Sequence, residues 1–169
     1  MEQKYIYSFS QIEDKVKALH ETNTEAAAAV ALSWLGLSRD ELKTLRVSDY
    51  NSTMRMLHSA GRVVYVREDL IADMLKAICE EAPEYSMGFF ITDVNSAYEA
   101  AEKQELSPIS VLKMRYFYEK HSAKLSGEPE DRVFLKEILR SVGESEADME
   151  KQFAEYEKDA PCLLYTSDA

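Results

Sequence analysis

Two short basic segments hold the side chains best suited to contact a phosphate. Residues 42–67 carry five basic side chains against one acidic, and residues 113–124 carry four against one. Lysine and arginine bind nucleic acids by neutralising backbone phosphates. The two segments therefore predict a DNA-binding face, whose candidate contacts are Lys43, Arg46, Arg55, Arg62, Lys113 and Arg115. An ordinary solvated surface of helices and a hairpin would give the same pattern, so both interpretations stay open.

The rest of the chain opposes tight binding to a polyanion. The full sequence has 20 basic and 31 acidic residues, for a net charge of −11, and residues 127–159 alone hold eleven acidic side chains against five basic ones. A DNA duplex would be attracted on one side of such a protein and repelled on the other. We therefore expect at most weak binding to DNA.

Other chemistries have little support in the sequence. Without the last eight residues, Cys79 is the only cysteine, which excludes a thiolate metal site and an intrachain disulfide. The histidines are too scattered for a ligand set: His20, His58 and His121. No spacing suggests a Ser/His/Asp or Cys/His pair, so we expect neither a metal nor a cofactor. The aromatic residues 116–118 could stack on bases, although their helical spacing is more typical of a core.

Apolar residues recur at intervals of three and four along most of the sequence, which predicts a mainly α-helical protein. The expected helices span residues 10–21, 24–36, 68–81, 94–104, 108–123, 130–142 and 146–158. Thr24 is the expected N-cap of the second helix, and Gly36 its end. Ser38 then begins a short helix, and Glu41 three residues later completes the S-x-x-E pairing of a capping box.

One small antiparallel sheet is expected between these helices. Residues 53–66 change to a period of two, with β-branched residues near the end and a turn at residues 59–61, which predicts a β-hairpin. The apolar run MGFFIT, residues 87–92, predicts one further short strand.

Residues 1–161 are expected to form one domain, because a chain that is 46% hydrophobic at this length can bury one core. No apolar run reaches the roughly 20 residues that span a bilayer, and the N-terminus lacks an export signal. These features predict a cytoplasmic protein with no membrane partner. The last eight residues, CLLYTSDA (162–169), resemble a translated sequencing adapter, with a disordered natural tail as the alternative.

The order helix, Gly-Leu turn, helix, hairpin and helix runs through the segment AAVALSWLGLSRDELKTLRVSDYNSTMRMLHSAGRVVYVREDLIADML. This segment resembles the first half of the catalytic domain of tyrosine recombinases, the phage integrase family. More weakly, SPISVLKMRYFY resembles the family's His-x-x-Arg helix, ILRSVGES its Leu-Gly-His-Ser stretch, and MEKQFAEYEKD the segment with the nucleophilic tyrosine. The resemblance implies a recombinase-like fold and an ancestral activity of breaking and rejoining DNA.

The family's chemistry, as the resemblance implies it, depends on cations around a phosphate that a tyrosine attacks. Two arginines and a histidine neutralise that phosphate, and a hairpin lysine protonates the leaving oxygen. In this chain the first arginine is replaced by Ser38, with Arg39 one position late, and the hairpin carries Arg62 in place of lysine. The other family positions fall on Leu112 (histidine), Arg115 (arginine, retained), Glu144 (second histidine) and Phe153 (tyrosine).

These substitutions favour a degenerate recombinase-like protein from a phage or other mobile element, unable to cleave DNA and retained for DNA binding or regulation. Its partners would be DNA, bound weakly, or an active recombinase or other phage protein, and it could form an oligomer. One alternative is a divergent active recombinase, in which Tyr156, one helical turn beyond Phe153, is the nucleophile and Arg115 converges with Arg39 or Arg62. The other is an acidic helical protein-interaction module with no DNA role.

Overall fold

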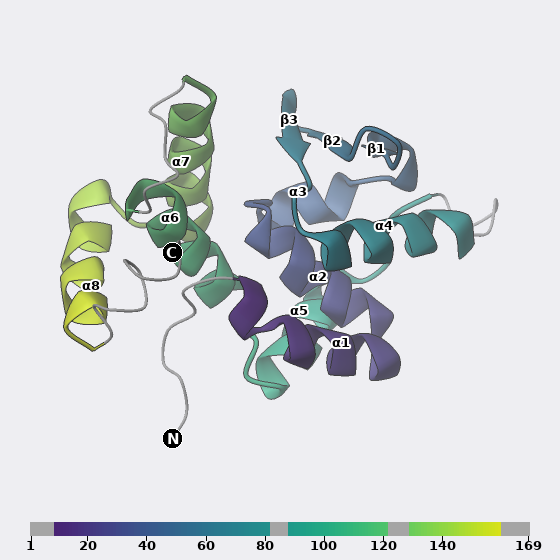
Figure 1. Ribbon diagram of the computed structural model, residues 1–169, viewed down its shortest axis with the longest axis horizontal. Helices are drawn as coiled ribbons and strands as arrows, with labels where there is room; N and C mark the ends of the chain where they lie inside the picture. Colours follow the sequence, from purple (N-terminus) through teal and green to yellow (C-terminus); the bar gives the residue numbers. More distant parts are fainter. Residues whose placement is uncertain (1–8, 82–87, 122–128, 160–169) are drawn as a thin grey trace.

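The structure, a computed structural model, describes residues 9–81, 88–121 and 129–159 (Figure 1). Within these residues the chain is mainly helical with one small antiparallel sheet, which confirms the predicted class. The elements are η1 (Phe9–Gln11), α1 (Glu13–Thr22), α2 (Thr24–Trp34), α3 (Arg39–Thr44), η2 (Val47–Asp49), β1 (Tyr50–Asn51), β2 (Met56–Ser59), β3 (Arg62–Tyr65), α4 (Asp69–Glu81), α5 (Val94–Lys103), α6 (Pro108–His121), α7 (Pro129–Val142) and α8 (Glu146–Asp159).

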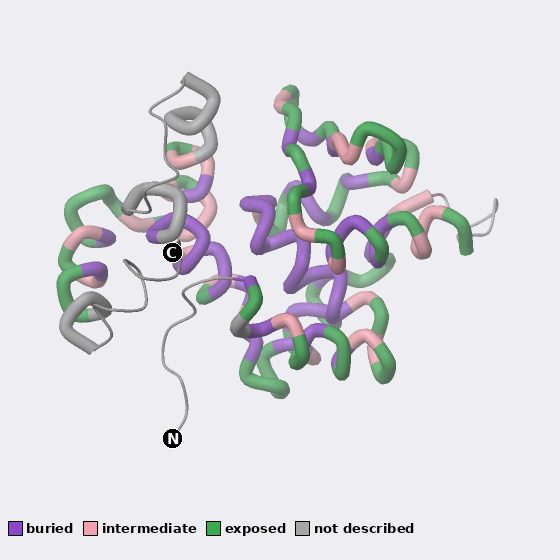
Figure 2. Tube along the Cα trace, viewed as in Figure 1, coloured by how far each residue is buried: buried purple, intermediate pink, exposed green. Residues whose placement is uncertain are grey.

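The alanine-rich helix α2 is the centre of the core. Its residues from Ala26 to Trp34 are all buried, and it packs against α1, α4, α5 and α6 (Figure 2). Alanine side chains are small, so several helices can approach α2 closely without leaving voids. The expected N-cap Thr24 is wrong by one residue, because the side chain of Asn23 accepts the backbone N–H of Ala26 at 3.0 Å. Asparagine is the stronger capping residue, and Thr24 becomes the first residue of the helix.

A glycine turn joins α2 to α3, as expected. Gly36 has a φ of 93°, which an L side chain rarely adopts, and the Leu37 N–H donates to the Leu32 carbonyl at 3.1 Å. Ser38 then caps α3. Its hydroxyl accepts the Glu41 N–H at 3.1 Å, and the Glu41 carboxylate accepts the Ser38 N–H at 3.0 Å. The predicted capping box is confirmed.

The sheet has the order β1-β2-β3, and its two pairings are antiparallel. The hairpin β2–β3 closes with the pair Ser59 and Arg62, around Ala60 (φ 50°) and Gly61 (φ 78°). Positive φ at both central residues is the pattern of a type I′ turn, whose twist matches that of the strands. The predicted hairpin and its turn are confirmed.

The strand predicted at residues 87–92 is wrong. Among its described residues, Phe89 forms a single bridge with Arg46, and the Phe90 N–H donates to the Leu45 carbonyl at 3.2 Å. Gly88 has a φ of 74°, so the backbone leaves the extended conformation before a ladder can form. The apolar run instead buries Phe90 and Ile91 in the core. A short apolar run cannot by itself distinguish these two outcomes.

The helices α6, α7 and α8 form a second group beside the first (Figure 1). Helix α6 packs against both α2 and α7, so it connects the two groups. The buried side chains of α7 and α8 include Ile138, Met149 and Phe153. No helix of the described residues is long and apolar enough to cross a membrane. Residues 162–169, interpreted from sequence as an adapter, lie outside the described part of the chain.

The type I′ turn gives a direct stability prediction. Replacing Ala60 by Asn should raise the free energy of unfolding by about 0.5–1 kcal/mol, because Asn adopts a positive φ with less strain than Ala. Urea denaturation followed by circular dichroism measures the change. Ala60→Val, which is strained further at this φ, is the matched control and should destabilise. Equal midpoints for wild type and Ala60→Asn would contradict the turn assignment.

Candidate functional site

The first part of the site is a buried polar cluster between α3 and the hairpin. Glu41 is 6% exposed, and its carboxylate accepts hydrogen bonds from Arg62 Nη2 at 2.9 Å and from the Ser59 hydroxyl at 2.8 Å. The same Nη2 atom donates to the Gly36 carbonyl at 2.9 Å. Arg62 therefore connects the glycine turn after α2 to the first turn of α3.

The charge of Glu41 is maintained by its neighbours. Burial alone would raise the pKa of the Glu41 carboxyl, but the hydrogen bonds from Arg62, Ser38 and Ser59 and the positive charge of Arg62 outweigh it, so the pKa lies below its ordinary value. The pair is therefore ionised at neutral pH. A buried carboxylate of this kind binds an arginine that would otherwise be available to an external anion.

Arg115, in α6, is bound in a similar way. Arg115 is 7% exposed, and its Nη1 donates to the Trp34 carbonyl at 3.1 Å and lies 3.9 Å from Glu68 Oε2. Its guanidinium lies over the Trp34 ring at 5.2 Å, and the Trp34 indole N–H donates to Glu68 Oε2 at 3.1 Å. Arg115 thus connects α6 to the last residue of α2 and to the start of α4.

The other residues that the resemblance singles out lie in the core or at helix ends. Leu112, which the resemblance aligns with a histidine, is fully buried. Phe153, which it aligns with the tyrosine, is 6% exposed, and its ring centroid lies 5.5 Å from that of Phe117. Gly143 ends α7 with a φ of 70°. Glu144, which it aligns with the second histidine, pairs with Lys113 Nζ at 3.0 Å.

Two residues of the active-recombinase alternative can be located. Arg39 is exposed on α3, and its guanidinium lies 4.3 Å from the centroid of the Tyr98 ring of α5. Tyr156 falls within α8, but its side chain is outside the described part of the chain. Arg39 therefore lies over the aromatic ring of Tyr98, and the role of Tyr156 as a nucleophile stays untested.

The six predicted DNA contacts differ in whether another side chain of the protein pairs with them. Arg62, Arg115 and Lys113 pair with Glu41, Glu68 and Glu144 as described above. Arg55 pairs with Asp69 at 2.9 Å, and the Arg46 guanidinium lies 4.9 Å from the Phe89 ring centroid. Lys43 is exposed on α3. Internal pairing reduces the positive potential that this face presents, and DNA binding at these residues stays a prediction.

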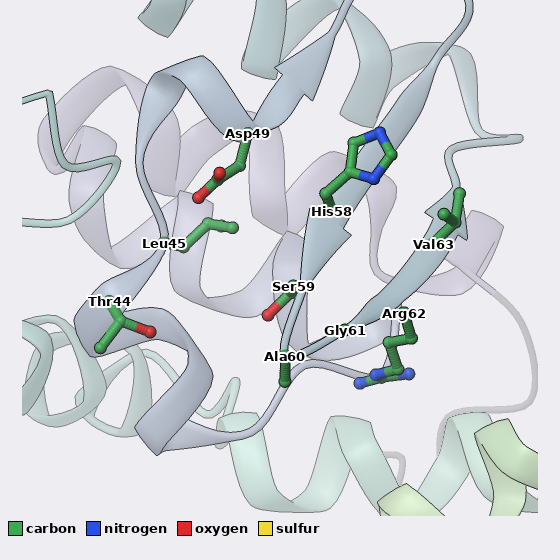
Figure 3. Close-up of a pocket in the computed structure, with 9 residues that line it drawn as sticks. All are labelled: Thr44, Leu45, Asp49, His58, Ser59, Ala60, Gly61, Arg62 and Val63. Carbon is green, nitrogen blue, oxygen red and sulfur yellow. The ribbon is translucent and has the colours of Figure 1, made fainter.

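A polar pocket of about 410 Å³ lies between α3, η2 and the hairpin (Figure 3). The hydroxyls of Thr44 and Ser59 and the carboxylate of Asp49 point into the same space, with His58 at its edge. Ser59 already donates to Glu41, and Asp49 accepts the Arg46 N–H at 2.8 Å. No group of three or more His, Cys, Asp or Glu side chains in the described residues is arranged to hold a metal.

Sequence reasoning missed the carboxylates that bind the two arginines. Glu41 was expected only as the capping partner of Ser38, and Glu68 and Trp34 were not singled out. A signal existed for Glu41, because its position in the capping box fixes its side chain beside Gly36. None existed for Glu68, whose contact with Arg115 joins residues 47 positions apart in the chain.

Comparison with protein-family models, curated proteins and solved structures finds no match for this chain.

The Glu41–Arg62 pair predicts a specific pattern of stability losses. Arg62→Met should lower the free energy of unfolding by about 3–5 kcal/mol, because it leaves a buried carboxylate without its partner. Adding Glu41→Gln should recover part of the loss, since the second change removes the unpaired charge. Chemical denaturation of the wild type, both single variants and the double variant measures the coupling. Additive losses would show that the two side chains act independently.

The same pair predicts a pH dependence. The pKa of Glu41 is lower in the folded state than the ordinary 4.5, so its stabilising charge is fully present above that value and is lost as pH falls through the lower folded pKa. The stability difference between wild type and Glu41→Gln should therefore be constant at neutral pH and shrink below about pH 4.5. Thermal unfolding between pH 7 and pH 3 measures it, with Glu99→Gln on the exposed face of α5 as control. An unchanged difference across that range would contradict the assignment.

Proposed function

We propose that this chain is a tyrosine-recombinase-like domain that does not cleave DNA and acts by binding. The observation that carries the proposal is that Arg62 and Arg115 are both bound inside the protein. Arg62 pairs with the buried carboxylate of Glu41 and donates to the Gly36 carbonyl in the turn after α2. Arg115 lies 3.9 Å from the partly buried carboxylate of Glu68 and donates to the Trp34 carbonyl at the end of α2. The order of helix, glycine turn, capped helix, hairpin and helix is also the order that the resemblance requires.

Phosphoryl transfer needs positive charge where negative charge develops on the phosphate, and removal of one such donor typically lowers kcat by about 10²–10³. A phosphate would have to compete with Glu41 for Arg62 and with Glu68 for Arg115. Glu144 adds a negative charge where the family has a histidine, although Lys113 pairs with it. The combined loss of several phosphate-stabilising groups is therefore expected to leave a very low kcat for DNA cleavage.

The nucleophile position supports the same conclusion. Phe153 has no hydroxyl group, and its ring packs against Phe117 in the core between α6 and α8. An attacking group must reach a phosphate in solvent, which a core side chain cannot do. Leu112 is also buried in the core. Two positions that the resemblance assigns to catalysis are therefore occupied by core side chains.

The binding function is proposed to be weak contact with DNA, with regulation of an active recombinase as its purpose. Lys43 and Arg67 are both exposed, and no ion pair holds either one among the described residues. Both fall in the basic segment of residues 42–67, which the resemblance aligns with a DNA-facing part of the family's fold. The net charge of −11 keeps the expected affinity low and strongly dependent on salt.

A salt titration against a duplex tests this proposal. Lys43→Glu and Arg67→Glu should each weaken binding, and the slope of log K against log salt should fall, because each variant removes one phosphate contact. Fluorescence anisotropy with a labelled 30-base-pair duplex at 25–200 mM salt measures both quantities. Lys17→Glu, on the exposed face of α1, makes the same charge change away from the hairpin and is the matched control.

Two outcomes would contradict the proposal. Equal weakening by Lys17→Glu would mean that net charge alone governs the binding, with no DNA-binding face. A covalent protein–DNA adduct on a nicked substrate, absent in Tyr156→Phe, would show that the chain is an active recombinase after all.

A further inference from the structure

The largest exposed apolar side chains of the described residues gather on the sheet. Met54 is 62% exposed, Tyr65 51% and Val63 42%, and all three belong to β3 or to the loop between β1 and β2. An exposed strand edge that carries apolar side chains is a template for pairing with another chain. Val63 and Tyr65 lie two residues apart, so they share one face of β3.

The backbone of the same two residues is also free for pairing. In the hairpin, Ser59 pairs with Arg62 and Leu57 with Val64, and the Val66 N–H donates to the Arg55 carbonyl at 2.9 Å. Within β3, the backbone groups of Arg62 and Val64 therefore face β2. Val66, just after β3, continues this alternation by bonding to Arg55. Val63 and Tyr65 direct their N–H and C=O groups away from β2. Since β3 is the last strand in the sheet of the described residues, this edge has no partner strand there.

A charge continues the exposed row. Arg67 follows Val63 and Tyr65 at the same spacing of two residues, and it is exposed. Its neighbour Asp69 is already paired with Arg55 at 2.9 Å. In the described part of the chain no carboxylate pairs with Arg67. The β3 edge thus presents two apolar side chains and one unneutralised cation in a line.

We propose that β3 binds an extended acidic segment of a partner protein as a fourth, antiparallel strand. The two other pairings of the sheet are antiparallel, and that geometry gives the better hydrogen bonds. The segment places a carboxylate opposite Arg67 and apolar side chains opposite Tyr65 and Val63. Read from its N-terminus, it has the pattern acidic, any, apolar, any, apolar. Its backbone supplies affinity and its alternate side chains supply specificity.

Two other occupants fit the edge less well. In a symmetric pairing of two copies centred on Val64, Arg67 of each copy falls opposite Gly61 of the other, so neither arginine is neutralised. A DNA backbone would satisfy Arg67 but would gain nothing from Val63, Tyr65 and Met54. The proposal depends on the sheet alone and holds whether or not the chain derives from a recombinase.

A designed peptide tests the proposal directly. The probe is the fluorescein-labelled peptide Ser-Glu-Thr-Val-Thr-Ile-Thr, added to the full chain up to 1 mM and followed by anisotropy. A second peptide carries N-methyl groups on its Val and Ile, which removes the two hydrogen bonds that these residues donate to β3 while keeping the side chains. We expect saturable binding of the first peptide and at least about tenfold weaker binding of the second.

A charge exchange then locates the contact. Arg67→Glu should weaken binding of the acidic peptide about tenfold and should restore it for a peptide in which the Glu is replaced by Lys. Arg39→Glu, exposed on α3, makes the same charge change away from β3 and should leave both affinities nearly unchanged. Because Arg67 is exposed, the variant is expected to fold, which circular dichroism checks.

Several results would overturn the proposal. They are absence of binding at 1 mM, equal binding of the N-methylated peptide, or no restoration by the Lys peptide. A concentration-dependent dimer in sedimentation velocity that Tyr65→Thr abolishes would assign the edge to a second copy. Competition by duplex DNA, with Val63→Thr and Tyr65→Thr both without effect, would assign it to nucleic acid.

Discussion

Glu41 and Arg62 meet at 2.9 Å in a place where each side chain is at least 89% buried, so the two charges must satisfy each other. This contact joins the closing pair of the hairpin to the glycine turn after α2 and to the first turn of α3, which follow one another in the chain. The Ser59 hydroxyl and the Ser38 N–H donate to the same carboxylate, and the Gly36 carbonyl accepts from the same guanidinium. The buried Nε of Arg62 has no hydrogen-bond partner among the described residues. Because an unpaired ion in this position is costly, the hairpin cannot move away from α3 without a large loss of stability.

The same contact explains why the hairpin carries arginine, since the guanidinium reaches a carboxylate and a carbonyl at once. Arg115 repeats the principle on the other side of α2, where Trp34 supplies both a carbonyl and an aromatic face and Glu68 supplies the charge. Two cations that the resemblance assigns to phosphate chemistry thus stabilise the fold. The account of a binding protein without cleavage activity depends on this exchange of roles more than on any single missing group.

How far the sequence could predict this structure depended on the range of each interaction. Local signals were sufficient for Ser38 and Glu41, for the turn at Ala60–Gly61 and for most helix positions, because those residues interact within a few positions of one another. The strand prediction for residues 87–92 was wrong, because burial of Phe90 and Ile91 in the core decided the conformation there. The pairs Arg62–Glu41 and Arg115–Glu68 could not be predicted from the sequence. Their residues are 21 and 47 positions apart, respectively, and nothing in either segment indicates its partner.

The most direct measurement follows the guanidinium groups themselves. The Nε–H resonances of Arg62 and Arg115 can be assigned with Arg→Lys variants and followed by ¹⁵N NMR while a duplex, or inorganic phosphate, is added. We predict that both resonances stay in place while that of the exposed Arg67 moves. Movement of the Arg62 and Arg115 resonances at the same ligand concentration would show that both arginines remain available to a phosphate, and would contradict their proposed role in holding the fold together.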